Sequence, residues 1–307
     1  MLRGARSVGI ASQPIGSRLV EVRNAVRELL ADAAATLRAA GVDNPEIDAQ
    51  LLLQAATGMT RTQLMITDRI GAAEAEAFTA MVRRRAGREP LQHITGTAYF
   101  RHVRLAVGPG VFVPRPETEV MTGWAIDRLR EVQGRPPVVV DLCTGSGAIA
   151  RALADEVPQA SVHAVELGES AVRWATENLA GTGVELRIGD MADAFADLNG
   201  AVDVVTCNPP YIPLTAWESV QTEARDHDPE LALFSGEDGL DAVRVLTDVA
   251  ARLLRPGGWV ACEHAEVQAE SVPELFARHG AFTEVRDHRD LSGRPRFSTA
   301  RRTAYER

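Results

Sequence analysis

Apolar residues in the first third of the chain recur every three or four positions, the spacing of one face of an α-helix. Gly41 follows the first such run and Gly58 the second, and glycine is a common stop signal beyond a helix. The Asn44-Pro45 pair and Thr60 are suitable starts for the second and third helices. The helices predicted by this pattern cover residues 18–40, 45–57, 60–65 and 72–85.

No strand pattern interrupts these helices, so residues 18–96 are expected to form a helical bundle domain behind a flexible N-terminus, residues 1–17. The pattern changes at residue 97, where apolar and polar residues begin to alternate and Gly108-Pro109-Gly110 punctuates the chain. We expect a β-hairpin linker over residues 97–113.

Beyond residue 113, short apolar runs alternate with helical stretches. The run 138–140 is three valines before a glycine-rich turn, which is typical of a buried parallel strand. The alternation predicts an α/β fold with a doubly wound, Rossmann-like sheet over residues 114–307. The predicted strands cover residues 138–140, 161–165, 184–188, 202–206, 259–263, 283–287 and 296–300, and the predicted helices cover residues 117–131, 148–156, 169–179, 240–253 and 267–279.

The composition removes several kinds of chemistry. All 33 basic residues of the 307 are arginine, which excludes a catalytic lysine, a Schiff base and a P-loop lysine. No apolar run approaches the ~18–20 residues of a membrane span, so no membrane association is expected. Cys143, Cys207 and Cys262 make no C-x-x-C, which favours a cytoplasmic location and offers no zinc site. The histidines show no metal spacing either, so no metal is expected.

The net charge of −9 is unevenly distributed along the chain. Residues 1–104 carry 14 arginines against 10 acidic residues, a net +4, whereas residues 105–307 carry 19 against 32, a net −13. Binding to nucleic-acid phosphates needs a positive field. The acidic C-terminal part therefore argues against direct nucleic-acid binding.

A glycine-rich run joins the first predicted strand of the sheet to the helix that follows it: Asp141-Leu142-Cys143-Thr144-Gly145-Ser146-Gly147. Glycines at such a turn let the backbone bend tightly and come close to a ligand. The run is not the G-x-G-x-x-G of nicotinamide-binding proteins, and no lysine follows to make a P-loop. It is a candidate ligand loop, with a plain glycine-rich connector as the alternative.

Acidic residues end the next two predicted strands. Glu166 lies 19 residues beyond Gly147, where an acid can accept hydrogen bonds from two ribose hydroxyls. Asp190, followed by Met191, is a candidate for contact with an adenine ring. The plainer interpretations are a solvated surface residue for Glu166 and a turn residue for Asp190.

The tetrad Asn208-Pro209-Pro210-Tyr211 directly follows the fourth predicted strand. Its two prolines remove two backbone donors and stiffen the segment, which leaves carbonyl acceptors beside the Asn208 side chain. Such acceptors can hold both hydrogens of a planar –NH2 group, and Tyr211 offers a face for packing. A proline-rich turn without function is the alternative.

These motifs resemble those of the class I, Rossmann-like S-adenosylmethionine methyltransferases, and the tetrad is similar to that of the branch that methylates exocyclic or amide nitrogens. Further segments narrow the resemblance, over about residues 18–302, to the release factor glutamine methyltransferases (the HemK/PrmC family). The resemblance implies a seven-stranded methyltransferase sheet, an N-terminal helical bundle that binds the substrate, and a β-hairpin linker. The segments that carry it are residues 89–96, 113–119, 229–233, 236–240, 255–258 and 290–294.

The resemblance also implies a reaction: methyl transfer from S-adenosylmethionine, giving S-adenosylhomocysteine, to the amide nitrogen (N5) of the glutamine in the Gly-Gly-Gln motif of bacterial peptide chain release factors. A monomer is expected. The implied catalytic residues are Asn208, Pro209, Pro210 and Tyr211. The implied cofactor-binding residues are Asp141, Cys143, Thr144, Gly145, Ser146, Gly147, Glu166, Asp190, Met191 and Asn208.

Two positions depart from the family pattern. Cys143 stands where the family usually has glycine, so the local turn must suit an L-residue. Met191 stands where some members have an aromatic residue, and a thioether can still pack on a ring face. We expect an altered cofactor affinity at most.

Two alternatives to this function stay open. The same tetrad serves nucleic-acid enzymes that methylate adenine N6 or guanine N2 of a flipped base, although the −13 charge disfavours them. The other is a catalytically inactive adaptor, which would have no need of the loop, Glu166 and the tetrad together.

Two charged clusters have plain interpretations. Glu117 and Glu119 are expected to be first-turn acids of a helix, with contact to cofactor or substrate as the alternative. Residues 83–85 and Arg88 are expected to form a solvated helix face, with a partner-facing patch as the alternative.

Overall fold

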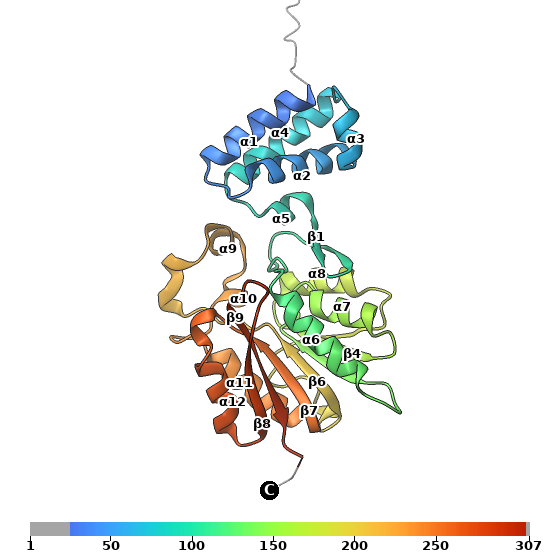
Figure 1. The fold of residues 1–307 in the computed structure, drawn as a ribbon, viewed down its shortest axis with the longest axis vertical. Helices are drawn as coiled ribbons and strands as arrows, with labels where there is room; N and C mark the ends of the chain where they lie inside the picture. Colours follow the sequence, from blue (N-terminus) through green and yellow to red (C-terminus); the bar gives the residue numbers. More distant parts are fainter. Residues whose placement is uncertain (1–24, 305–307) are drawn as a thin grey trace, which may run out of the picture.

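The computed structural model describes residues 25–304 and consists of a helical part and a larger α/β part (Figure 1). The predicted flexible N-terminus and the first residues of the predicted first helix, 18–24, lie outside the described residues. The helical part buries one apolar cluster of its own, which includes Leu37, Leu52 and Phe78. Its helices are α1 (Val26–Ala39), α2 (Pro45–Thr57), α3 (Arg61–Ile66), α4 (Ala72–Ala86) and α5 (Leu91–Thr95).

The predicted helix starts of α2 and α3 differ in their capping. Pro45 occupies the first turn of α2 and Gly58 ends the helix in the left-handed conformation, as predicted, but the Asn44 side chain makes no capping hydrogen bond. Thr60 does cap α3: its hydroxyl accepts from the Gln63 amide at 3.3 Å. The Gln63 side chain in turn accepts from the Thr60 amide at 2.8 Å, which completes a capping box.

A short hairpin, β1 (Thr97–Phe100) and β2 (Val103–Ala106), follows α5 and connects the two parts. Its turn residue, Arg101, is anchored to the α/β part. The Arg101 guanidinium pairs with Glu156 and donates to the Glu119 carbonyl, while the Glu119 carboxylate accepts from the Arg101 amide at 3.0 Å. Glu119 therefore fixes the hairpin to the first turn of the next helix, α6 (Thr118–Arg130).

The sheet has seven strands in the order β5-β4-β3-β6-β7-β9-β8, which confirms the predicted α/β class. The strands from β5 to β7 are parallel, and β9 and β8 pair antiparallel at the edge. The chain runs outward from β3 in one direction and from β6 in the other, so the switch point of the sheet lies between these two strands. The strands are β3 (Val138–Leu142), β4 (Ser161–Glu166), β5 (Glu185–Ile188), β6 (Val202–Cys207), β7 (Leu254–Glu263), β8 (Phe282–Arg289) and β9 (Pro295–Arg302).

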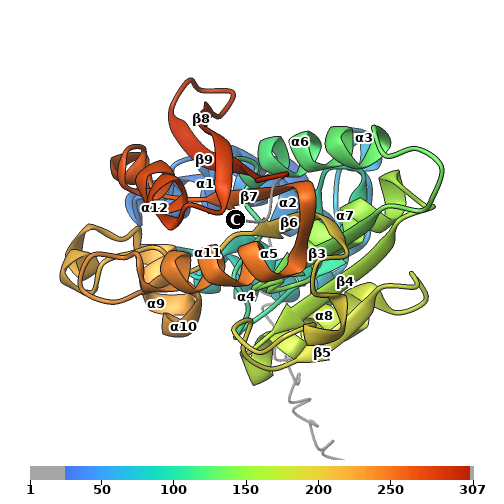
Figure 2. The same cartoon turned by 90° about the horizontal axis from the view of Figure 1, so that it is seen from below.

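Helices cover both faces of this sheet, and Figure 2 shows α6 and α11 on opposite sides of the central strands. Alternate residues of a strand pack into two separate hydrophobic cores, one on each face of the sheet, because neighbouring side chains of a strand point to opposite faces. Val139 packs in the core with α6 (Thr118–Arg130), α7 (Ala148–Glu156) and α8 (Glu169–Leu179). Val140 packs in the core with α11 (Asp241–Leu253) and α12 (Ser271–His279).

The observed elements differ from the predicted ones at several boundaries. β7 begins at Leu254, which pairs with Val202, so residues 255–258 form an irregular stretch inside the strand instead of a turn before it. α12 begins at Ser271, because the 3₁₀ turn η3 (Glu266–Gln268) precedes it. The sequence also did not predict α5, η1 (Ala196–Leu198), η2 (Leu214–Ser219), α9 (Thr222–His227) and α10 (Glu230–Leu233).

Across residues 25–304, no helix is both long enough and apolar enough to cross a bilayer.

Candidate active site

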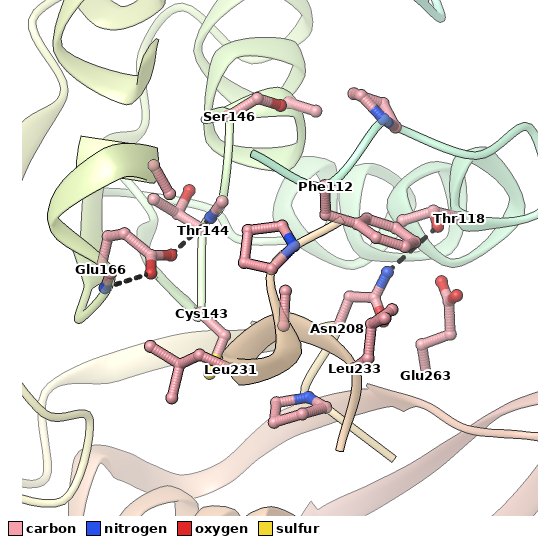
Figure 3. Close-up of a pocket in the computed structure, with 18 of the residues that line it drawn as sticks. Phe112, Thr118, Cys143, Thr144, Ser146, Glu166, Asn208, Leu231, Leu233 and Glu263 are labelled. Atoms are coloured by element: carbon pink, nitrogen blue, oxygen red, sulfur yellow. Dashed lines mark hydrogen bonds between the residues drawn. The ribbon is translucent and has the colours of Figure 1, made fainter. Parts of the chain in front are cut away.

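A cavity of about 800 Å³ opens at the carboxyl ends of the central strands, at the switch point of the sheet. In doubly wound sheets this crevice is where ligands bind. The loops after β3, β4, β5 and β6 line it together with the segment before α6 and the stretch 220–233. Figure 3 shows Glu166 and Thr144 on one side of it and Asn208, Thr118 and Glu263 on the other.

The glycine-rich loop after β3 forms part of the cavity wall through four consecutive residues: Cys143, Thr144, Gly145 and Ser146. Gly145 has a left-handed φ of 57°, and no atom lies within 4 Å of where its Cβ would be. The loop therefore presents bare backbone to the cavity, as a close ligand contact requires. Gly147 caps α7 with a φ of 82° and does not line the cavity.

Asp141 is completely buried under this loop and does not line the cavity. Its two carboxylate oxygens accept hydrogen bonds from the hydroxyls of Thr144, at 2.6 Å, and Thr206, at 2.8 Å. Burial raises the pKa of Asp141 to about 7, although both hydrogen bonds act in the opposite direction. Its contacts tie the loop to β6.

Glu166, at the end of β4, also fixes the loop while it faces the cavity. One carboxylate oxygen accepts from the Gly145 amide and the other from the Gly168 amide, each at 2.7 Å. Each oxygen keeps a further lone pair, so the carboxylate can still accept from two ligand hydroxyls.

The residues directly after β5 also line the part of the cavity near Glu166. Asp190 is exposed, and its carboxylate accepts from the Ala192 amide at 2.9 Å. Met191 is buried, and its sulfur lies 3.7 Å from the Cys143 sulfur. The two positions that depart from the family pattern therefore contact one another. Cys143 adopts a left-handed φ of 56°, a conformation that favours glycine.

The tetrad after β6 lines the cavity through Asn208, Pro210 and Tyr211, whereas Pro209 does not. The Asn208 amide nitrogen donates to the Thr118 hydroxyl at 3.4 Å, which leaves its side-chain carbonyl free to accept. Burial raises the pKa of Tyr211, so its hydroxyl stays protonated. The Gln268 side chain donates to the Tyr211 carbonyl at 3.0 Å and fixes the backbone of the tetrad.

Sequence reasoning missed Glu263, the last residue of β7. It lines the cavity, is fully buried, and its Oε2 has no hydrogen-bond partner. Burial raises its pKa to about 7, against the opposing effects of Thr118, Arg296 and Tyr211. A signal was available, because Glu263 ends its predicted strand just as Glu166 ends β4.

The segment before α6, which carries part of the family resemblance, supplies further residues near the cavity. Phe112 lines the cavity, and the Arg115 guanidinium lies 4.9 Å from its ring centre. Arg115 also donates to Asp228 at 3.3 Å, and burial raises the pKa of Asp228 to about 7. Glu117 lines the cavity and lies directly before the first residue of α6.

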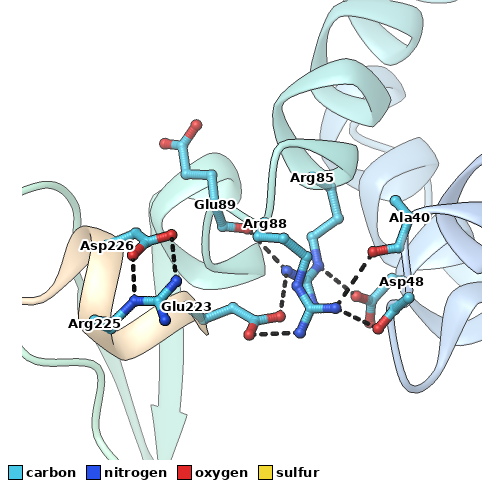
Figure 4. A network of polar contacts seen from close by, with 9 residues as sticks. Ala40, Asp48, Arg85, Arg88, Glu89, Glu223, Arg225 and Asp226 are labelled. Atoms are coloured by element: carbon cyan, nitrogen blue, oxygen red, sulfur yellow. Dashed lines mark hydrogen bonds and ion pairs between the residues drawn. The ribbon is translucent and has the colours of Figure 1, made fainter. Parts of the chain in front are cut away.

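The wall formed by residues 212–233 is held by the helical part (Figure 4). Glu223, on α9, accepts from Arg85 at 3.0 Å and from Arg88 at 2.7 Å, and Arg85 also pairs with Asp48 at 2.7 Å. Arg85 is only 8% exposed, so the predicted solvated face is wrong for this residue. We call these four residues the interdomain network.

Within residues 25–304, no three His, Cys, Asp or Glu side chains come together as a metal site.

Comparison with known proteins matches the helical part and the α/β part to separate family models. Two family models match: the PrmC N-terminal domain over residues 28–96 and the methyltransferase small domain over residues 105–224. The release factor glutamine methyltransferase of Streptomyces coelicolor is 56% identical over 274 residues, 89% of this chain and 96% of the relative. That of Mycolicibacterium smegmatis is 47% identical over 281 residues, 91% of this chain and 98% of the relative.

Among solved structures, the release factor-specific protein-(glutamine-N5) methyltransferase of Alicyclobacillus acidocaldarius is similar at 29% identity and a TM-score of 0.40. The similarity covers 64% of this chain and 98% of that one.

Proposed function

Because the chain belongs to the release factor glutamine methyltransferase family, we propose that it transfers a methyl group from S-adenosylmethionine to a glutamine of a bacterial peptide chain release factor. The acceptor is the side-chain amide nitrogen, N5, of the glutamine in the Gly-Gly-Gln motif. The observation that carries the proposal is one cavity with Glu166 on one side and Asn208 on the other. One side can hold a nucleoside, and the other can hold an amide.

The residues around Glu166 fit S-adenosylmethionine. The lone pairs left on Glu166 suit two ribose hydroxyls, and the open space over Gly145 suits a ligand against bare backbone. Asp190 and Met191 line the position expected for the adenine. When bound, S-adenosylmethionine supplies a methyl group activated by a positively charged sulfur. Cys143, Thr144, Ser146 and Asn208 are the remaining residues proposed to contact it, whereas Asp141 and Gly147, which do not line the cavity, are proposed to act by shaping the loop.

The tetrad would orient the substrate amide. An amide nitrogen is a poor nucleophile because its lone pair is delocalised, so its direction of approach matters. We propose that the Asn208 side-chain carbonyl holds one N–H group and that the Pro209 carbonyl, between two residues that line the cavity, holds the other once the substrate is seated, while Pro210 and Tyr211 bound the site. Such placement can lower the barrier by up to ~7–11 kcal/mol. Acceptors that bind more strongly as positive charge grows on the nitrogen add electrostatic stabilisation.

We also propose how the remaining parts of the chain are used. Residues 18–96 hold the release factor, residues 97–113 connect, and residues 114–307 carry out the transfer and release S-adenosylhomocysteine. The protein would act as a monomer in the cytoplasm. The three cysteines are free, which suits a reducing compartment.

Two other functions have less support. A nucleic-acid amino-methyltransferase would place a flipped base at the tetrad, but residues 105–307 carry a net charge of −13. An inactive adaptor would not require an unobstructed cavity with an uncommitted acceptor at Asn208.

The test is incubation with isotope-labelled S-adenosylmethionine and a release factor, RNA or DNA in separate reactions. We expect label in the release factor, at the motif glutamine by peptide mass spectrometry, and none when that glutamine is replaced by alanine. Label in nucleic acid and not in protein would overturn the proposal. Label in neither would favour the adaptor.

Asn208→Ala tests the division of labour within the cavity. It removes the amide acceptor but leaves the loop and Glu166 in place, so methyl transfer should fall at least 100-fold while the cofactor dissociation constant changes less than about fivefold. Calorimetric titration and a single-turnover assay measure the two. Parallel loss of binding and turnover would contradict the assignment.

A further inference from the structure

Glu263 places a carboxylate on the substrate side of the cavity. It ends β7 beside the tetrad, and Figure 3 shows its carboxylate directed toward the region that Asn208 and Thr118 share. Its Oε2 is buried and has no hydrogen-bond partner in the structure. A buried carboxylate oxygen without a partner is costly, and such costs are usually found where a ligand completes the contact.

The other carboxylates of the cavity, Glu117, Glu166, Glu169 and Asp190, are all less buried than Glu263, so water competes with the substrate for their oxygens. Glu166 lies on the opposite side, and both its oxygens accept backbone N–H groups. Asp190 is exposed and accepts the Ala192 amide. The Asn208 side chain and the Pro209 carbonyl can hold a hydrogen but are too weakly basic to take it as a proton.

We propose that Glu263 is a catalytic residue whose Oε2 accepts the proton that the substrate amide nitrogen loses on methylation. This inference rests on the proposed function, since it assumes an amide held at Asn208. The proton then goes to a fixed group of the chain instead of directly to water.

The step balances as follows. The nitrogen lone pair forms the new N–C bond, the donor's C–S bond breaks, and its electron pair goes to sulfur. The nitrogen, which now carries two hydrogens and the methyl group, is positively charged and no longer planar. One N–H bond breaks, its electron pair stays on nitrogen, and the proton goes to Glu263 Oε2. The products are a neutral N-methyl amide and a neutral carboxylic acid, which water can later deprotonate.

The groups that face Glu263 come from three neighbouring elements. Thr118 and Glu117 lie at the start of α6, Tyr211 in the tetrad, and Arg296 on β9. Glu117 and burial favour the neutral acid, and Arg296 and the two hydroxyls favour the carboxylate. Because the resulting pKa is about 7, the accepting form is gained as the pH rises through neutrality.

The experiment compares wild type with Glu263→Gln, which keeps the size of the side chain but cannot take a proton. With a release factor as substrate, the single-turnover rate of wild type should rise with pH and level off above about pH 8. Glu263→Gln should be at least 100-fold slower and insensitive to pH from 6 to 9, with cofactor affinity within twofold of wild type. Glu263→Asp should recover part of the rate.

The matched control is Glu270→Gln, the same change at an exposed residue outside the cavity, which should behave as wild type. A readout without turnover is infrared difference spectroscopy of the cofactor-free protein. A protonated carboxylic acid that titrates near neutral pH should be present in wild type and missing from Glu263→Gln.

A Glu263→Gln rate within threefold of wild type would overturn the inference, and so would a wild-type rate that is flat from pH 6 to 9. If the variant fails to bind cofactor, the pH dependence of the wild-type rate alone decides whether the inference stands. Failure of the proposed function is distinguishable, because wild type would then leave the release factor unmethylated. The infrared titration would still decide whether Glu263 is the neutral-range acid that the inference requires.

Discussion

Glu263 has opposite expected effects on catalysis and on stability. Burial raises its pKa to about 7, whereas an unfolded glutamate titrates near 4.3. A carboxyl whose pKa is raised by folding destabilises the folded chain once the unfolded chain is ionised, so this cost grows as the pH rises from about 4.5 to 7. Glu263→Gln should therefore be more stable than wild type at pH 8, by about 4 kcal/mol at most.

Thermal unfolding of both proteins at pH 5, 6, 7 and 8 measures this difference. The advantage of the variant should shrink steadily toward pH 5. An advantage of constant size would mean that the pKa of Glu263 is not the cause.

Gly239 packs against the backbone of the tetrad, and only a residue without a side chain fits there. Its φ is 76°, and a Cβ there would lie 2.3 Å from the Tyr211 carbonyl oxygen. Gly239→Ala should lower the free energy of unfolding by about 3 kcal/mol, from left-handed strain and overpacking together. Gly181→Ala is the matched control, since φ is 74° with no atom within 4 Å, and it should cost only about 1 kcal/mol.

Denaturant unfolding of the two variants separates the cost of the left-handed backbone, which both share, from the cost of the clash with Tyr211, which only Gly239→Ala has. Equal losses would mean that the contact with Tyr211 contributes nothing.

Single residues of the site differ in how far the sequence alone could place them. Gly145, Glu166 and Asn208 each follow a parallel strand, so their meeting at one edge of the sheet could be predicted. Asp141 also ends such a strand, but its burial depends on the Thr206 hydroxyl of a strand 65 residues away, which no local pattern reports. Glu263 has no local signal beyond its place at the end of a predicted strand, because the groups around it, Thr118, Tyr211 and Arg296, come from distant parts of the chain.

At the scale of elements, Asp203 joins the beginnings of three neighbouring strands. It lies on β6, accepts the Val138 amide of β3 at 2.8 Å, and pairs with Arg135 and with Arg255 of β7. Burial alone would raise the pKa of Asp203, but the hydrogen bonds from Arg135, Val138 and Arg255 outweigh it and lower the pKa.

Asp203→Asn should therefore destabilise the fold by about 2–3 kcal/mol at pH 7. Because the pKa is lowered on folding, the stabilising effect is present above about pH 4 and is lost as the pH falls through the folded-state value. The gap between variant and wild type should close in acid. Asp197→Asn, which breaks an exposed pair with Arg187, is the matched control and should change stability much less.

Elements were predictable where their signals are local. Helices with repeated apolar residues and a cap or a glycine stop, such as α2 and α3, lie within a few residues of their predicted bounds. The short elements α9 and α10 were not predicted, because fewer than two turns carry little periodicity. Distant contacts hold them: the Ile212 amide donates to the Leu233 carbonyl at 2.8 Å, and Glu223 binds two arginines of the helical part.

At the scale of the whole molecule, the interdomain network links the helical part to one wall of the cavity. Glu223→Ala removes the acceptor shared by Arg85 and Arg88, so the wall should open more often. We expect the KM for the release factor to rise about tenfold, the loss of roughly one charge-assisted hydrogen bond, with faster amide hydrogen exchange over residues 212–233.

Asp226→Ala is the matched control, because the exposed Asp226 lies on the same helix and pairs only with its half-buried neighbour Arg225 in the network drawn in Figure 4. Its KM and exchange should stay within twofold of wild type. Equal effects of the two variants would show that the network does not hold the wall.

The interdomain network also decides what can be exchanged between relatives. A chimaera that takes its helical bundle from another family member would bring new residues to the positions of Arg85, Arg88 and Asp48, but would keep Glu223 in the recipient's cavity wall. A bundle without matching cations would leave that glutamate half-buried and unpaired. The smallest exchangeable module is therefore the bundle together with α9, two segments more than a hundred residues apart in the chain.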